Sequence, residues 1–218
     1  MLSVRRIPTE TPNLAKQGLP SVIRVLLDSP SGLILVSGPT GSGKTTTMAA
    51  MVDAINDMRA SHVVTVEDPI EYLFTRNRSV FSQREVGVDC GSFLDGVRAA
   101  LRQRPDVIVI GEIRDRETAE QAFVAGESGH LVIGTLHASS AVGTVGKMLS
   151  FFKDDERESR IQSMSGTRSA QGMPLAATSS SSVSRPTKRG CSTNWIPRLW
   201  KPTWRCGVPG LLAIATRR

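Results

Sequence analysis

The sequence predicts an α/β fold in which helices flank a parallel sheet. Three observations support this prediction: short, wholly apolar runs at 33–36 and 107–110, helical stretches between such runs, and glycine-rich or acidic segments directly after them. Strands that alternate with helices of about ten to fifteen residues form right-handed βαβ units. We therefore expect the functional residues at the edge of the sheet where its strands end.

Residues 20–164 hold the regular elements in alternation. Capping residues mark several helix starts: Pro20 opens a short helix, Ser92 with Asp95 forms a capping box, and Asp115 precedes a later helix. We expect strands at 33–36, 62–66, 106–111 and 131–135, a short edge strand at 79–82 and a polar loop at 83–87. We expect helices at 20–29, 45–58, 92–102, 115–127, 139–152 and 154–164.

The strand at 33–36 leads directly into a phosphate-loop (Walker A) pattern. Residues 38–45 read GPTGSGKT, with the required glycines, lysine and threonine, and a helix follows. Backbone N–H groups at such a helix start favour anionic phosphate. Lys44 reaches the β- and γ-phosphates, and the Thr45 hydroxyl is placed to ligate Mg²⁺. The alternative is a strand-to-helix turn without a ligand.

These features predict a site for a nucleoside triphosphate. The predicted binding residues in the loop and at the start of the helix are Gly38, Pro39, Thr40, Gly41, Ser42, Gly43, Lys44, Thr45 and Thr46.

Carboxylates gather after two further strands. Glu112 follows the apolar run at 107–110, the position of the acidic residue that holds Mg²⁺ in phosphate-loop enzymes. Glu67, Asp68 and Glu71 follow the strand at 62–66. The alternatives are a surface glutamate at a strand end and a solvated turn at Asp68.

The net positive charge of the sequence comes from its C-terminal part. Of 27 Lys and Arg residues, nine lie in 166–218, which leaves 18 against 20 Asp and Glu in the rest. Residues 166–218 contain all three tryptophans, four consecutive serines and no acidic residue, and we expect them to be disordered or to be a frameshifted tail. Their charge would attract nucleic acid nonspecifically, but no recognisable nucleic-acid module accompanies it, so this partner is not expected.

The cysteines and the lengths of the apolar runs indicate the cellular location of the protein. Cys90, Cys191 and Cys206 fit neither a disulfide framework nor a metal-binding spacing, which indicates a reducing, cytoplasmic location. No apolar run approaches the roughly 18 residues needed to span a bilayer. We expect any membrane contact to be made through partner proteins.

Five long motifs occur in order: GPTGSGKTTTMAAM at 38–51, TVEDPIEY at 65–72, QREVGVD at 83–89, LRQRPDVIVIGEIRDRET at 101–118 and ESGHLVIGTLHASSA at 127–141. Together they resemble the secretion ATPase superfamily, and most closely its PilT-like twitching-motility ATPases, which retract type IV pili. The resemblance implies a RecA-like P-loop NTPase core at 31–165, preceded by an interdomain linker and short helix at 1–30. It ends before the basic tail at 166–218. On this view the chain is truncated at both ends and its sheet is incomplete.

The resemblance also implies roles for particular residues. Glu71 matches the glutamate that orients the attacking water, with Glu67 as a second catalytic candidate beside Glu112. His130 and His137 match a histidine box that links the γ-phosphate to the subunit interface. Arg84, Arg114 and Arg116 are further candidates for contacts with phosphate or with a neighbouring subunit, and form the weakest set.

The same resemblance implies ATP and Mg²⁺ as cofactors and a hexameric assembly of identical subunits. Its partners would be pilus-machinery proteins at the inner membrane. A related secretion or conjugation ATPase shares these motifs, although the match at 101–118 favours twitching motility. Because flanking family sequence is missing, an inert nucleotide-binding remnant is a further hypothesis, and low activity is expected of the chain alone.

Overall fold

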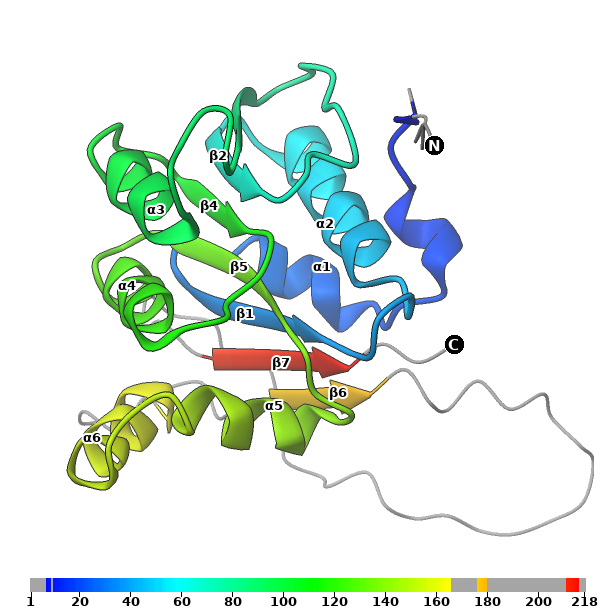
Figure 1. Ribbon diagram of the computed structural model, residues 1–218. Coiled ribbons are helices and arrows are strands. Elements are labelled where there is room, and N and C mark those ends of the chain that lie inside the picture. Colours follow the sequence, from blue (N-terminus) through cyan, green and yellow to red (C-terminus); the bar gives the residue numbers. More distant parts are fainter. Residues whose placement is uncertain (1–6, 9, 166–175, 180–210, 216–218) are drawn as a thin grey trace, which may run out of the picture.

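The computed structural model describes residues 7–8, 10–165, 176–179 and 211–215, and it has helices on both faces of a parallel sheet (Figure 1). The strands are β1 Gly32–Ser37, β2 His62–Glu67, β3 Val80–Glu85, β4 Val107–Ile110, β5 Leu131–Leu136, β6 Ala176–Ser179 and β7 Leu211–Ala215. Their order in the sheet is β3-β2-β4-β5-β1-β7-β6, and each neighbouring pair is parallel. The predicted α/β class is confirmed.

Three of the α-helices begin directly after a capping side chain. They are η1 Leu14–Gln17, α1 Val22–Leu27, α2 Lys44–Met58, α3 Phe93–Leu101, α4 Arg116–Glu127, α5 Ala141–Leu149 and α6 Asp154–Ser165. Ser92, Asp115 and Ser140 each accept a hydrogen bond from a backbone N–H three residues further on. The short 3₁₀ helix η1 falls within the predicted linker, where Asn13 caps it by accepting the N–H of Ala15.

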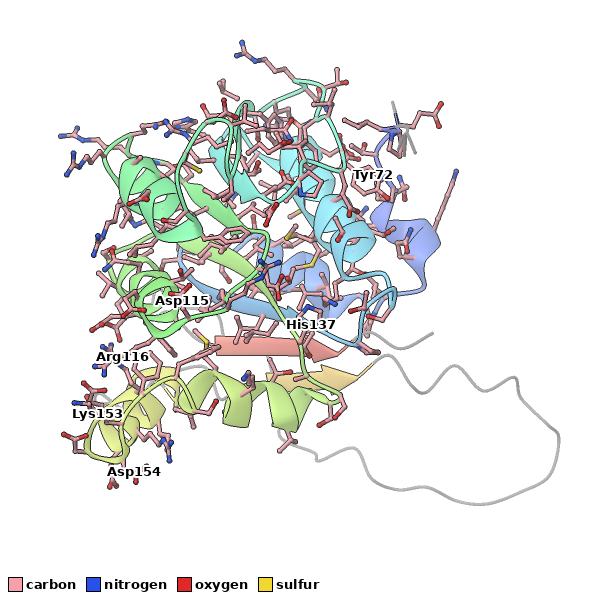
Figure 2. The ribbon with its side chains drawn as sticks, viewed as in Figure 1. Tyr72, Asp115, Arg116, His137, Lys153 and Asp154 are labelled. Carbon is pink, nitrogen blue, oxygen red and sulfur yellow. The ribbon has the colours of Figure 1, made fainter. Side chains whose placement is uncertain are left out.

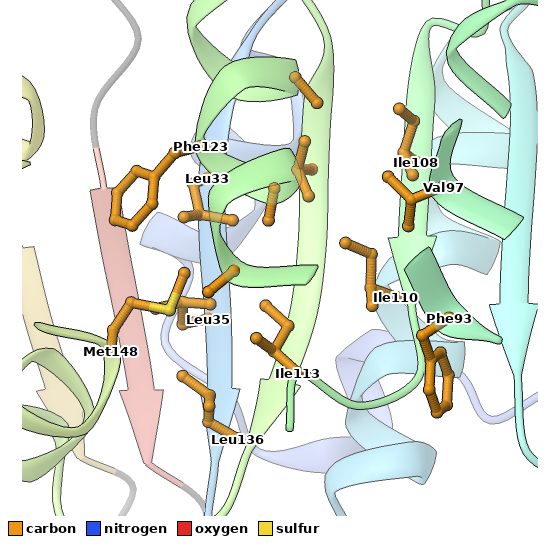
Figure 3. Close-up of a cluster of buried hydrophobic side chains, with 14 of the residues drawn as sticks. Leu33, Leu35, Phe93, Val97, Ile108, Ile110, Ile113, Phe123, Leu136 and Met148 are labelled. Carbon is orange, nitrogen blue, oxygen red and sulfur yellow. The ribbon is translucent and has the colours of Figure 1, made fainter. Parts of the chain in front are cut away.

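Both faces of the central strands are buried, which explains why these strands are mostly apolar. Leu33 and Leu35 of β1 belong to a core that includes residues of α3, α4 and α5 (Figure 3). Ile34 and Val36, which alternate with them, belong to a second core with α1 and α2. Every residue of β1 is buried, so the strand is a fixed support for the segment that follows it.

The segment that leaves β4 crosses toward β5. Ile113 donates its backbone N–H to Thr135 at 2.9 Å, and the Thr135 hydroxyl donates to the carbonyl of Gly111. Ile113 also packs over Gly134 of β5, where an added Cβ would lie 2.7 Å from the Ile113 Cδ1 atom. These contacts hold Glu112, which lies between Gly111 and Ile113, near the end of β5.

The sequence misplaced the end of the edge strand. Residues 83–85, predicted to be in a loop, are the second half of β3, and the predicted strand at 79–82 is too short. Gln83 pairs in register with Thr65, and Glu85 with Glu67. Pairing with the buried strand β2 outweighs the weak strand propensity of the polar residues.

A second difference concerns the basic tail. Residues 176–179 and 211–215, predicted to be disordered, are strands β6 and β7, and β7 pairs with β1 from Leu33 to Ser37. The apolar run at 211–215 suits a parallel strand next to β1, whose backbone groups it pairs on that side. The remainder of the predicted tail lies outside the described residues.

Candidate active site

The phosphate loop connects β1 to α2, and its glycines set the turn. Gly41 and Gly43 have φ angles of 74° and 87°, in the left-handed region that favours glycine. The Lys44 ammonium donates to the carbonyls of Gly38 at 3.0 Å and Pro39 at 3.1 Å, so the loop surrounds its side chain. Burial lowers the pKa of Lys44, and the nearby charge of Glu112 opposes that shift.

The other predicted loop residues differ in how far they are exposed to solvent. Thr45 and Thr46 are half-buried in the first turn of α2, while Pro39, Thr40 and Gly41 are exposed at the tip of the loop. The loop therefore presents backbone and hydroxyl groups at the same edge of the sheet as the acidic residues.

Glu112 is held by two neighbouring side chains. Its Oε1 atom lies 3.0 Å from Nε2 of His137, and its Oε2 atom accepts from Nε of Arg114 at 2.7 Å. Hydrogen bonding to Glu112 raises the pKa of Arg114, whose guanidinium also lies 3.7 Å from Asp68. Arg114 and His137 therefore orient the carboxylate that the sequence identified. The Arg114–Glu112 pairing was not predicted, although the two residues are only two positions apart.

Glu67 and Glu71 occupy different environments. The Glu67 residue is only 5% exposed, and its carboxyl accepts from Thr65 Oγ1 at 2.7 Å and Gln83 Nε2 at 3.4 Å. Burial raises the pKa of Glu67, although these hydrogen bonds and one from the Glu71 backbone oppose the shift. Glu71 is half-buried on the connection between β2 and β3, so the geometry favours Glu71 over Glu67 for contact with solvent.

The β2–β3 loop, residues 68–79, reaches the start of α2. The Tyr72 hydroxyl lies 3.3 Å from Thr46 Oγ1, and Figure 2 labels Tyr72 beside α2. This contact connects the loop that carries Glu71 with the helix that begins at the phosphate loop. Tyr72 had not been singled out, because nothing local in the sequence indicates its partner.

The two predicted histidines lie at opposite ends of strand β5. His137 follows β5 and contacts Glu112, so it joins the site (Figure 2). His130 precedes β5, and its Nδ1 atom lies 3.2 Å from the Ala125 carbonyl. Within this chain His130 and the phosphate loop lie at opposite ends of the parallel strands, so the structure does not bring His130 together with Lys44. Its role at the nucleotide stays a prediction.

Of the three arginine candidates, only one lies at the site. Arg114 belongs to the site, whereas Arg116 pairs with Glu156 at 2.6 Å and connects α4 to α6. Arg84 lies on the edge strand β3, which is separated from β1 by three strands.

The predicted Mg²⁺ ligands are the Thr45 hydroxyl and the Glu112 carboxylate. In proteins Mg²⁺ takes one or two protein oxygens, several waters and substrate phosphates, and both groups supply oxygen. This donor set fits the ion. Among the described residues, no three His, Cys, Asp or Glu side chains are grouped so as to hold a metal by themselves.

Comparison with known proteins identifies the family. Residues 12–165 match the profile described as Type II/IV secretion system protein. The chain belongs to this family. The family resemblance inferred from the five motifs is thus confirmed. No helix in the described part of the chain is long and apolar enough to cross a membrane.

Two relatives show how far the similarity to this family extends. The type IV pilus retraction ATPase PilT of Pseudomonas aeruginosa is 44% identical over 153 residues, which cover 70% of this chain and 44% of that protein. The uncharacterized protein YggR of Escherichia coli K12 is 45% identical over 166 residues, covering 76% of this chain and 51% of YggR. The chain thus spans about half the length of these relatives.

Solved structures of the family share the fold. The pilus retraction motor PilT with bound ADP superposes with a TM-score of 0.70 at 49% identity, over 73% of this chain and 47% of that one. The ATPase DotB of Legionella pneumophila superposes with a TM-score of 0.68 at 36% identity, over 72% of this chain and 44% of that one.

Proposed function

We propose that this chain is the ATP-binding and ATP-hydrolysing core of a motor subunit that drives retraction of type IV pili. One observation carries the proposal: Lys44, Glu112 and the β2–β3 loop that bears Glu71 lie together at the edge of the sheet where the strands end. A PilT structure with bound ADP supports it, because that structure is 49% identical to the aligned part of this chain.

The site residues have separate roles in phosphoryl transfer. Lys44 and the backbone N–H groups of the loop bind and orient the β- and γ-phosphates. Mg²⁺, when bound through Thr45 and Glu112, supplies charge neutralisation at the phosphates. Arg114 and His137 orient the Glu112 carboxylate, and Glu71 accepts a proton from the attacking water.

The proposed assembly follows the family resemblance. We propose a homohexamer in the cytoplasm that acts on inner-membrane proteins of the pilus machinery. A role in a secretion system is the second candidate, since the family profile that residues 12–165 match is described as Type II/IV secretion system protein. Expression in a strain that lacks its retraction ATPase separates the two, because restored twitching supports pilus retraction.

Lys44→Ala tests the nucleotide site. We expect this variant to lose binding of a fluorescent ATP analogue at matched Mg²⁺, because no other loop residue places a positive charge at the β- and γ-phosphates. Lys147→Ala is the matched control, since Lys147 is exposed on α5 beside the ring of Phe151. Equal affinity in Lys44→Ala and the parent would contradict the assignment.

A further inference from the structure

The backbone around Glu71 is anchored from the strands beneath it. The backbone N–H of Ile70 donates to Glu85 Oε2 at 3.1 Å, and the Glu71 backbone hydrogen-bonds to the carboxyl of Glu67. Both anchors come from residues at the ends of β2 and β3. The β2–β3 loop therefore has a defined path on the N-terminal side of the candidate catalytic side chain.

One amide fixes the path on the other side. Gln83 of β3 donates from Nε2 to the Tyr72 carbonyl at 2.8 Å, and its Oε1 atom accepts the backbone N–H of Phe74 at 3.1 Å. The same Nε2 atom reaches Glu67 Oε1 at 3.4 Å. Both ends of the amide are thus engaged, which a carboxylate or an apolar side chain of similar length cannot reproduce.

This arrangement connects the edge strand to the phosphate loop. The Gln83 amide holds the backbone of Tyr72, whose hydroxyl lies 3.3 Å from Thr46 Oγ1 in the first turn of α2. Glu71 is the neighbour of Tyr72 in this path. A shift of about 1 Å in a catalytic group is enough to lower a rate on the order of 10²-fold.

We propose that Gln83 is a positioning residue for ATP hydrolysis, whose amide holds the β2–β3 loop so that Glu71 faces the nucleotide edge of the sheet. This role rests on the proposed function. Gln83 does not touch the nucleotide; it acts through the backbone of Tyr72 and Phe74. It therefore affects the rate of hydrolysis more than the affinity for nucleotide.

Gln83→Met tests this role, because it keeps the length of the side chain and removes both polar ends. We expect kcat to fall on the order of tenfold, while affinity for a fluorescent ATP analogue changes less than about threefold. Gln103→Met is the control, since the Gln103 side chain donates only to the Ala99 carbonyl on α3 among the described hydrogen bonds. If Gln83→Met does not fold, Gln83→Glu, which keeps the acceptor for Phe74, replaces it.

A double variant distinguishes positioning from general destabilisation. If Gln83 acts through Glu71, then adding Gln83→Met to Glu71→Gln lowers kcat little further. Independent, multiplicative losses, or an unchanged kcat in Gln83→Met, would overturn the role of Gln83 alone. Absence of ATP turnover in the unsubstituted protein would instead overturn the proposed function, and the role of Gln83 with it.

Discussion

The phosphate loop and the β2–β3 loop meet at one edge of the sheet but are held by contacts of different range. In the phosphate loop, Lys44 bonds to carbonyls five and six residues away. In the β2–β3 loop, Gln83 bonds to Tyr72 across 11 residues, and Asn56 bonds to Ser79 across 23. The first site is encoded locally, whereas the second depends on the finished sheet.

If the two regions have separate tasks, a change in the β2–β3 loop lowers hydrolysis and spares binding. Glu71→Gln keeps the size of the side chain and removes its charge. We expect ATP turnover to fall on the order of 10²-fold for a lost general base, with binding of a fluorescent ATP analogue retained. Phosphate release under saturating ATP and Mg²⁺ measures the effect.

Glu117→Gln is the matched control for this change, because Glu117 is exposed in the first turn of α4. Its turnover should equal that of the parent. Unchanged turnover in Glu71→Gln would remove Glu71 from the site and direct attention to Glu67. Loss of nucleotide binding in Glu71→Gln would show that the β2–β3 loop contributes to binding as well as to hydrolysis.

Asn56→Ala sharpens the comparison at the other end of the β2–β3 loop. Asn56 is 2% exposed; its Oδ1 atom accepts the N–H groups of Asn77 and Ser79 at 3.1 Å, and its Nδ2 atom donates to the Thr75 carbonyl at 2.8 Å. Truncation leaves these groups without that partner. We expect the free energy of unfolding to fall by about 1–3 kcal/mol, measured by urea denaturation.

Asn77→Ala is the control, since the Asn77 side chain is exposed and donates only to Asp57 among the described hydrogen bonds. We expect its effect to stay within about 0.5 kcal/mol. Equal effects of the two variants would mean that the buried anchor is no stronger than a surface contact.

The smallest expected effect concerns pH. Because burial raises the pKa of Glu67, the folded protein keeps this proton at a higher pH than the unfolded chain does. Its contribution to the free energy of unfolding is therefore complete below the usual pKa of 4.5 and declines as pH rises through the raised value. Glu67→Gln cannot ionise, so its free energy of unfolding should decline less over that window.

Urea denaturation at a series of pH values compares the two slopes. Glu127→Gln, at an exposed position at the end of α4, should keep the slope of the parent. A parent and a Glu67→Gln variant with the same slope would contradict the direction given for Glu67.

Local signals in the sequence predicted much of the fold. The four central strands, the phosphate loop and the caps at Ser92 and Asp115 were predicted, because apolar runs and capping residues act over a few positions. The placement of Glu112 and His137 at one edge followed from parallel strands. Contacts set by the order of strands were not predictable in this way.

The differences between sequence and structure also depend on contacts between strands that are distant in the chain. Residues 83–85 have weak strand propensity, and only pairing with β2 makes them a strand. His130 and His137 lie in one motif, yet the full length of β5 separates them. The partners of Gln83 and Arg114 were missed, because composition does not show which polar side chains will meet. The domain boundaries predicted at 30 and 165 stay predictions.

The contact between Gly134 and Ile113 has a consequence for how such a site can change during evolution. An added methyl group at 134 would lie 2.7 Å from the Ile113 Cδ1 atom, so the buried Ile113 would have to move. Ile113 directly follows Glu112, and both lie on the segment tied to Thr135. A single change of volume on the adjacent strand therefore acts first on the Ile113 side chain, next to the acidic residue, and leaves every polar group of the site in place.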